Sequence, residues 1–256
     1  MFAEERQRQI DTYLKNHGAV TTARLIEMFH VSIETIRRDL LQMERQGRLT
    51  RVHGGAIAAG DMKPYPSLSQ RSKEFEPQKL ALSQKAAELV NEGDIIGINA
   101  GSTAVVFAET LRQKFSALTV VTYALDVFQT LCNHKNFSVI LCGGQYLQSE
   151  NAFYGPLTLD TLRSLHMQKS FLCPSAVSWQ YGVCDYQAEL LDMQKQLIYS
   201  SDEVYILADS SKFEKKALLK ITDMQKDYTY VTDDGLPKEL QEWYRENNIN
   251  LQIGRN

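Results

Sequence analysis

The stretch that decides the fold is residues 32–47, which read SIETIRRDLLQMERQG. It predicts one helix with a defined start and end, because Ser32 is a good N-cap and Gly47 stands where a C′ glycine closes a helix. Glu34 lies in the first turn, where the helix dipole favours a negative charge. The apolar side chains recur at i, i+4 and i+7 and predict the buried stripe, which consists of Ile36, Leu40 and Met43.

The opposite side of this helix is basic. Arg38, Gln42 and Arg45 project from the far side, and Arg37 flanks them. An apolar back and an arginine-bearing front suit a helix that reads the major groove, because arginine offers bidentate donors to guanine or a charge to phosphate. A solvated surface helix is the alternative interpretation. The surrounding sequence favours the DNA-reading one.

The composition is that of a soluble globular protein, with 43% apolar and 23% charged residues among 256. No window holds the roughly 18 uncharged apolar residues of a membrane helix, and the polar N-terminus carries no signal peptide. We therefore expect a cytoplasmic protein without a membrane partner. The cysteines show no metal-site or disulfide spacing, which predicts reduced thiols and no metal; they are Cys132, Cys142, Cys173 and Cys184.

Charge is unevenly distributed along the chain. Residues 1–57 hold nine Lys/Arg and seven Asp/Glu, a net charge of +2, whereas the remainder holds 19 and 24, a net charge of −5. A small basic domain joined to an acidic body is typical of a DNA-binding module attached to a part that does not touch DNA. The asymmetry is modest and supports the interpretation without deciding it.

The segments around residues 32–47 predict a winged helix-turn-helix. Helices over 4–16 and 22–29 precede it, and the short turn at 30–31 leads directly into Ser32, as in a helix-turn-helix motif. Residues 48–58 then form a strand, a glycine turn and a return strand, which predicts a β-wing. Arg48, Arg51 and His53 are expected to meet the phosphate backbone or the minor groove there.

Residues 34–40, ETIRRDL, together with RVHGGA at 51–56, resemble the signature of the DeoR family of bacterial sugar-metabolism regulators. The resemblance implies that Thr35, Arg37 and Arg38 contact double-stranded operator DNA and that Asp39 orients a neighbouring arginine. Alternatively, Asp39 is a surface partner of Arg37 or Arg38, which is worth little. The complete predicted DNA-binding set is Ser32, Glu34, Thr35, Arg37, Arg38, Arg45, Arg51 and His53.

A proline-containing stretch, residues 60–67, predicts an extended hinge. We expect the winged helix-turn-helix domain at 1–58, a linker at 59–76 and an effector domain at 77–256. The effector domain alternates strands with helices and predicts an α/β fold with a mostly parallel sheet. The predicted strands are 94–99, 118–122, 137–142, 170–173, 203–208, 228–231 and 250–253; the helices are 77–91, 103–114, 124–133, 158–165, 187–200 and 238–247.

Ligands of such sheets bind at the carboxyl ends of the strands. Residues 99–104, NAGSTA, follow the first strand and open a helix, so their small side chains and free amides suit an anion, although an ordinary capped turn has the same features. Residues 209–213, DSSKF, add a lysine beside two hydroxyls, as a second grip on phosphate. The predicted ligand-binding set is Asn99, Gly101, Ser102, Thr103, Thr122, Tyr123, Gly143, Gly144, Ser175 and Lys212. Lys169, Asp185 and Glu189 are further candidates, and Trp179 and Tyr181 suit a lid or a subunit contact.

The DeoR resemblance extends over this region and rests on the segments VVT 120–122, GG 143–144, Gly155, GV 182–183, DSSKF 209–213 and TD 232–233. It implies a domain similar in fold to ribose-5-phosphate isomerase and a phosphorylated sugar as ligand. The chain departs from the family pattern at Asn99, Tyr123, Lys169 and residues 173–175. These departures affect the sugar-facing half of the site, whereas the phosphate end matches.

We expect a DNA-binding regulator, a homodimer or homotetramer that a phosphorylated sugar releases from its operator. No catalytic residue and no cofactor are predicted, so the chain is not expected to be an enzyme. One alternative is a sugar-phosphate isomerase or deaminase with an added DNA-binding domain, for which Asp185 or Glu189 would serve as the base. A body that only forms oligomers and binds no ligand is the other.

Overall fold

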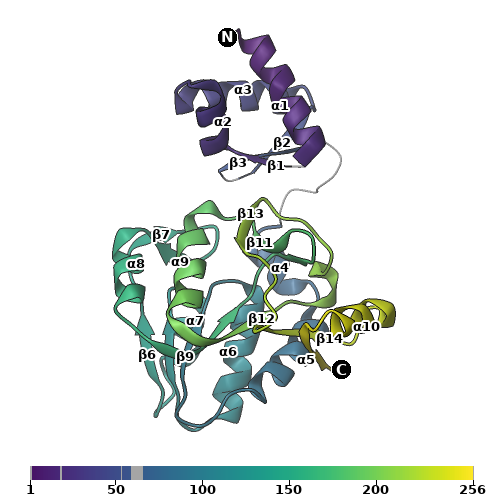
Figure 1. Ribbon diagram of the computed structural model, residues 1–256. Coiled ribbons are helices and arrows are strands. Elements are labelled where there is room, and N and C mark those ends of the chain that lie inside the picture. Colours follow the sequence, from purple (N-terminus) through teal and green to yellow (C-terminus); the bar gives the residue numbers. More distant parts are fainter. Residues whose placement is uncertain (1, 18, 53, 59–65, 256) are drawn as a thin grey trace. The chain divides into compact units, whose positions relative to one another are not determined.

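The computed structural model describes residues 2–17, 19–52, 54–58 and 66–255. Two compact units are present, and the long N-terminal run of the first unit ends at Pro66 (Figure 1). Most of the predicted hinge, residues 60–65, lies outside the described residues, as does His53. None of the helices in the described part of the chain is long and apolar enough to span a membrane.

The N-terminal unit is a winged helix-turn-helix. Its helices are α1 (Ala3–His17), α2 (Thr22–Phe29) and α3 (Ile33–Arg45), and its strands are β1 (Ala19–Thr21), β2 (Leu49–Val52) and β3 (Gly55–Ala58). The strands form an antiparallel sheet in the order β1-β3-β2. The predicted helices and wing are therefore confirmed. Strand β1 was not predicted, because three residues are too few to show a period of two.

Local chemistry sets the ends of the helices in this unit. The Thr21 hydroxyl accepts a hydrogen bond from the Arg24 amide at 3.0 Å, and the Ser32 hydroxyl accepts one from the Thr35 amide at 3.3 Å. These are N-caps of α2 and α3. Gly47 has a φ of +68°, as a C′ residue requires. The apolar stripe of α3 is fully buried against α1 and α2, and the core includes Ile10, Leu14, Leu25, Ile36, Leu40 and Met43.

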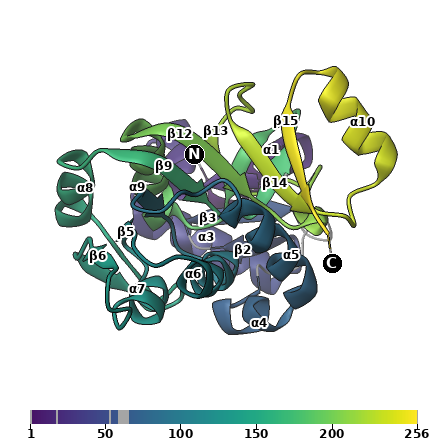
Figure 2. The same cartoon turned by 90° about the horizontal axis from the view of Figure 1, so that it is seen from below.

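The second unit is an α/β domain built on one parallel sheet. The strands are β4 (Ile95–Ile98), β5 (Thr119–Thr122), β6 (Ser138–Leu141), β9 (Met167–Leu172), β12 (Ser201–Leu207), β14 (Thr229–Asp233) and β15 (Asn250–Gly254). The helices are α4 (Leu68–Lys73), α5 (Glu76–Ala87), α6 (Ser102–Lys114), α7 (Leu125–Leu131), α8 (Pro156–Arg163), α9 (Ala188–Tyr199) and α10 (Lys238–Glu246). Every predicted strand and helix of this domain has a counterpart here. Figure 2 shows α5, α6 and α7 along one side of the sheet.

The strand order locates the topological switch point of this sheet. The order is β15-β14-β12-β9-β4-β5-β6, and all neighbouring strands run parallel. The chain starts at β4, proceeds through β5 to β6, and then returns to the other side of β4 at β9. The topological switch point therefore lies between β4 and β9, where α/β proteins open a crevice at the carboxyl edge.

Five short strands were not predicted. Strands β7 (Gln145–Leu147) and β8 (Ala152–Tyr154) form a hairpin, and β10 (Ala176–Ser178), β11 (Gly182–Asp185) and β13 (Leu219–Thr222) form a small sheet. Each has three or four residues, so neither alternation nor composition distinguishes it from a loop. Their pairing partners, rather than their own sequence, make them strands.

Candidate DNA-binding and ligand-binding sites

The exposed face of α3 carries the predicted arginines. Arg37, Arg38 and Arg45 are exposed, and within the described residues Arg38 and Arg45 form no ion pair. Arg37 pairs with Glu34 at 2.8 Å across one helical turn, and both side chains are more than half exposed. Such a pair is weak and exchanges easily for a phosphate. Helix α3 therefore has an exposed arginine face, and its contacts with DNA stay predictions.

Other members of the predicted DNA-binding set also hold the domain together. The Ser32 hydroxyl lies 3.0 Å from the Thr35 hydroxyl, so both side chains take part in the N-cap of α3. Glu44 accepts hydrogen bonds from the backbone amide and the guanidinium of Arg51, each at 2.9 Å. This contact ties strand β2 to the end of α3. Their contacts with DNA stay predictions, as does that of His53, which lies outside the described residues.

Arg48, a predicted contact of the wing, is paired within the N-terminal unit. Its guanidinium forms an ion pair with Asp11 of α1, with Nε at 3.0 Å from the carboxylate, and a further bond to Gln7. The side chain is only 30% exposed. The ion pair joins the start of β2 to α1, and the contact of Arg48 with the phosphate backbone stays a prediction.

Asp39 also differs from both sequence interpretations. Its side chain is 5% exposed and accepts a hydrogen bond from Arg6 Nε at 2.8 Å, and Arg6 itself is only 8% exposed. Gln7 contributes a longer contact of 3.5 Å to the same carboxylate. Asp39 is thus neither a surface partner of Arg37 or Arg38 nor their orienting group. It is one half of a buried ion pair that fixes α3 on α1.

In the effector domain, the loop after β4 lies at the switch point. Asn99 is fully buried, and its Oδ1 accepts a hydrogen bond from the Cys173 amide at 2.9 Å, which links the ends of β4 and β9. Gly101 is the N-cap of α6 with a φ of +133° and offers no side-chain cap. Asn99 Nδ2 and Thr103 Oγ1 are buried without a hydrogen-bond partner among the described residues. Buried groups of this kind are costly unless something satisfies them.

Lys212 lies on the loop that follows β12, and β9 separates this strand from β4, which precedes the Gly101 loop. The Nζ of Lys212 donates a hydrogen bond to the Pro174 carbonyl at 3.0 Å and lies 3.7 Å from Asp209 Oδ2. A Cβ built on Gly101 would lie 3.8 Å from the carbonyl oxygen of Cys173. The Gly101 and Lys212 loops therefore contact consecutive residues of one segment, and the structure brings the two predicted phosphate-binding loops together.

The sheet order separates the remaining candidates. Thr122 and Tyr123 follow β5, next to β4; the Thr122 hydroxyl accepts from the Ala124 amide at 3.0 Å, and Tyr123 is fully buried in the main core. Gly143 and Gly144 follow β6, four strands from β12, which is about 19 Å at the usual strand spacing. A Cβ on Gly144 would lie 2.2 Å from Thr158 Oγ1 and 2.6 Å from the Tyr154 carbonyl. Close packing against α8 therefore explains that glycine.

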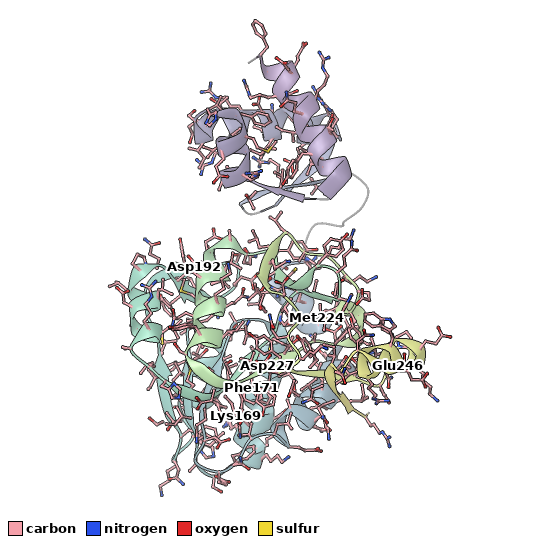
Figure 3. The ribbon with its side chains drawn as sticks, viewed as in Figure 1. Lys169, Phe171, Asp192, Met224, Asp227 and Glu246 are labelled. Carbon is pink, nitrogen blue, oxygen red and sulfur yellow. The ribbon has the colours of Figure 1, made fainter. Side chains whose placement is uncertain are left out.

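Two further candidates have other partners. Lys169, next to Phe171 along β9 (Figure 3), forms a buried ion pair with Asp94 at 2.5 Å. Asp94 lies at the amino end of β4, so Lys169 does not join the ligand site. Asp185 is buried and accepts from the Tyr186 amide at 2.7 Å. The described residues contain no group of three or more His, Cys, Asp or Glu that is arranged to hold a metal ion.

Ser175 and Trp179 lie along the strand that leaves the switch point. The Ser175 amide donates to the Cys184 carbonyl at 3.1 Å, which begins the β10–β11 pairing. Trp179, at the turn of that hairpin, packs edge-on against Trp243 of α10 with ring centroids 5.1 Å apart. Lys216 stands 4.3 Å above the Tyr181 ring. The hairpin is therefore held to the body of the domain by its aromatic side chains.

Three charged residues near the Lys212 loop were not in the predicted ligand-binding set. Asp233 is fully buried and accepts hydrogen bonds from the Ser210 amide at 2.6 Å and its hydroxyl at 2.8 Å, so it shapes the loop that carries Lys212. Asp209 is buried beside Lys212. Lys79 on α5 is also buried, and burial followed by the charge of Lys212 lowers its pKa. Lys79 shares the apolar stripe of its helix with Leu82 and Ala86, and that misplaced charge is the signal that sequence reasoning had available.

A winged helix-turn-helix with an exposed arginine face, joined in one chain to an α/β unit whose switch point brings the Gly101 and Lys212 loops together, defines the class: a DNA-binding transcription regulator with a sensor unit. Residues 6–60 match the DeoR-like helix-turn-helix domain, and residues 74–234 match the DeoR C terminal sensor domain. The chain therefore belongs to the DeoR family of transcriptional regulators.

Its relatives are similar over nearly their whole length. The L-fucose operon activator of Haemophilus influenzae is 32% identical over 245 residues, which is 95% of this chain and 97% of that protein. The lactose phosphotransferase system repressor of Streptococcus mutans is 32% identical over 237 residues, 91% of this chain and 93% of that protein. Among solved structures, ribose 5-phosphate isomerase A from Methanocaldococcus jannaschii covers 55% of this chain and 56% of its own, with 19% identity and a TM-score of 0.41.

Proposed function

We propose that this regulator binds operator DNA through α3 and the wing, and that a phosphorylated sugar bound at the β4–β9 switch point releases it. The observation that supports the ligand most directly is the convergence of the Gly101 and Lys212 loops on residues 173–174. The uncapped start of α6 supplies amide donors and a positive dipole end for a phosphoryl group. Thr103 Oγ1 and Asn99 Nδ2 would gain partners from the same ligand.

The direction of control is part of the proposal. The two relatives named above are an activator and a repressor, so their names do not decide it. Release follows if the ligand binds more tightly to a state in which the DNA-binding domains fit the operator poorly. We further propose that two or four copies act together, because one helix-turn-helix unit reads few base pairs.

The experiment measures operator affinity during titration with phosphorylated sugars. DNA selected by the protein from a random pool is labelled, and anisotropy reports binding as hexose, pentose and amino-sugar phosphates are added. At least one compound is expected to weaken DNA binding tenfold or more. Tighter binding would reverse the proposed direction of control, and no response to any of the compounds would remove the sensor role.

Lys212→Ala tests the ligand contact itself. A ligand at about 100 times its dissociation constant stabilises the native protein by roughly 2.7 kcal/mol, which a thermal melt detects. The variant is expected to lose most of that stabilisation and to bind DNA normally without ligand. Lys215→Ala, three residues on and exposed, is the matched control. Normal ligand binding by Lys212→Ala would refute the phosphate-clamp assignment.

We also propose that the protein does not turn its ligand over. Ribose 5-phosphate and glucosamine 6-phosphate are the substrates to test, because the alternative function would be an isomerase or a deaminase. The expected result is stabilisation by a bound sugar phosphate without product formation. Turnover that disappears in Asp185→Asn or Glu189→Gln would instead establish an enzyme.

A further inference from the structure

Helix α4 lies within residues 59–76, the predicted linker, and polar contacts hold it in place. It begins with a capping box, in which Ser67 Oγ accepts from the Gln70 amide at 3.3 Å and Gln70 Oε1 accepts from the Ser67 amide at 3.0 Å. None of its residues is buried. A six-residue helix without a buried face depends on contacts with its neighbours for stability.

Two such contacts come from opposite directions. Arg71 Nη2 lies 2.6 Å from each carboxylate oxygen of Glu150, which precedes β8, and the two side chains are 13% and 6% exposed. Lys79 Nζ donates to the carbonyl of Arg71 at 2.5 Å and lies 3.4 Å from that of Ser72. The last carbonyls of a helix lack amide partners four residues further on, so the Lys79 ammonium caps the C-terminus of α4 together with the Glu74 amide, which also donates to the Arg71 carbonyl.

Lys79 also belongs to the neighbourhood of the proposed ligand. Helix α5 packs on the sheet and runs into the amino end of β4 through residues 88–94, so its first turns lie towards the carboxyl edge. The end of β15 touches this part of the helix, since a Cβ on Gly254 would lie 2.3 Å from the Ala81 carbonyl. After burial itself, the positive charge of Lys212 lowers the pKa of Lys79, and the negative charge of Asp209 partly offsets this effect. The two ammonium groups therefore repel one another, and the buried carboxylate of Asp209 offsets this repulsion only in part.

We propose that Lys79 is a switch between α4 and the ligand: in the free protein its ammonium caps α4, and when a phosphoryl group binds beside Lys212 it turns to that anion and releases the carbonyls of Arg71 and Ser72. This inference rests on the proposed function of the switch-point site. An ionised phosphoryl oxygen is a stronger acceptor than a neutral carbonyl, so the ligand competes successfully. Helix α4 then keeps the Glu150 contact but loses the Lys79 cap, and this part of the predicted linker becomes mobile.

The test is amide hydrogen exchange on the full chain. Two conditions are compared, inorganic phosphate against chloride of matched ionic strength, and glucose 6-phosphate serves as a second probe. In the wild type, phosphate is expected to protect the first turn of α6 and to accelerate exchange of the amides around Glu74, whose N–H bonds to the Arg71 carbonyl. The expected acceleration is about tenfold, since a hydrogen bond to a charged group contributes at least that factor.

Variants separate the switch from the binding site. Lys79→Met should exchange fast at α4 without phosphate and show no further acceleration with it, whereas Lys85→Met, on the same helix with an exposed partner, should behave as the wild type. Glu150→Gln removes the second contact of α4. Exchange at α4 should therefore be faster in this variant than in the wild type, and phosphate should accelerate it further. Circular dichroism checks that each variant is folded.

Three results would overturn the inference, and each points to a different step of it. Protection of α6 with unchanged exchange at α4 would refute the switch and leave the proposed function standing. A wild type in which neither probe protects the amides of α6 or changes the exchange of α4 would count against both the proposed function and the switch. Unchanged α4 exchange in ligand-free Lys79→Met would show that Lys79 does not anchor the helix.

Discussion

The buried ion pair between Arg6 and Asp39 makes a prediction that separates folding from DNA recognition on one helix. Arg37, Arg38 and Asp39 are consecutive, yet only Asp39 is buried, with its carboxylate 2.8 Å from Arg6 Nε. Asp39→Ala leaves the guanidinium of Arg6 in a buried site without its carboxylate. Removing one partner of a buried pair costs about 3–5 kcal/mol.

That loss is large for so small a unit. At about 0.05–0.15 kcal/mol per residue, a domain of the size of the winged helix-turn-helix has a free energy of unfolding of roughly 3–9 kcal/mol. Each kcal/mol shifts the midpoint of such a domain by about 4–8 °C. We therefore expect the melting transition of the N-terminal unit to fall by more than about 12 °C, while that of the effector domain stays in place. Differential scanning calorimetry of the full chain measures both transitions.

The refuting result is specific. If the N-terminal transition of Asp39→Ala lies within about 2 °C of the wild type, the pair does not support α3, and the reasoning from burial fails. The double variant Arg6→Met with Asp39→Leu is the control, because replacing both partners by apolar groups of similar volume removes the unpaired charge. It should recover most of the lost stability.

Four further predictions test other parts of the structure. Arg38→Ala should weaken DNA binding by about 1–3 kcal/mol if the side chain contacts a base, and a gel-shift assay measures this loss. The free energy of unfolding should change by less than about 0.5 kcal/mol in a urea melt. A large loss of stability would contradict the exposed position of Arg38. Gly182→Ala should lower the free energy of unfolding by about 3 kcal/mol, because its φ is +81° and the new Cβ would lie 2.3 Å from the Thr222 carbonyl. Gly93→Ala is the control, since it has the same φ but open space around it, and it should cost only about 1 kcal/mol. Equal losses of stability in denaturant melts would show that packing plays no part. One of the four thiols, Cys132, should react quickly with a thiol reagent at pH 8, since it is exposed while burial raises the pKa of Cys142 to about 11; a fast phase that survives Cys132→Ser would disprove this. Hydrogen bonds from the amides of Ser116 and Ala117 lower the pKa of Glu92 below 4.5, so its stabilising effect is present above that pH and is lost as the pH falls through the lower folded value; the melting-temperature difference between wild type and Glu92→Gln should vanish in acid, and a difference that persists there would refute the assignment.

Local signals were enough for the elements that carry the function. Helix α3 begins and ends as its own caps and stripe require, and the seven main strands follow from apolar runs between turn residues. The Gly101 and Lys212 loops were predictable as partners because parallel strands place their carboxyl ends on one edge, whatever the strand order. These inferences need only information within a few residues of each element.

Contacts between distant residues were not predictable in this way. Asp39 and Arg6 are 33 positions apart and Lys169 and Asp94 are 75, so neither pair leaves a local pattern. The ligand candidates after β6 were grouped with Lys212 because strand order was unknown, and the sheet separates them by four strands. Lys79 lies on the apolar stripe of α5, and only the tertiary structure explains this charge, because its ammonium donates to a carbonyl of α4.

The amino-acid sequence alone thus determined the bounds and the arginine face of α3, the α/β class and the two loops proposed to bind a phosphoryl group, because capping, periodicity and strand-end chemistry are local. Only the tertiary structure decided which charges form pairs inside the protein and which stay exposed. The partner of an arginine, lysine or carboxylate depends on what packing brings within about 3 Å, the length of a hydrogen bond, and the positions along the chain do not encode that distance.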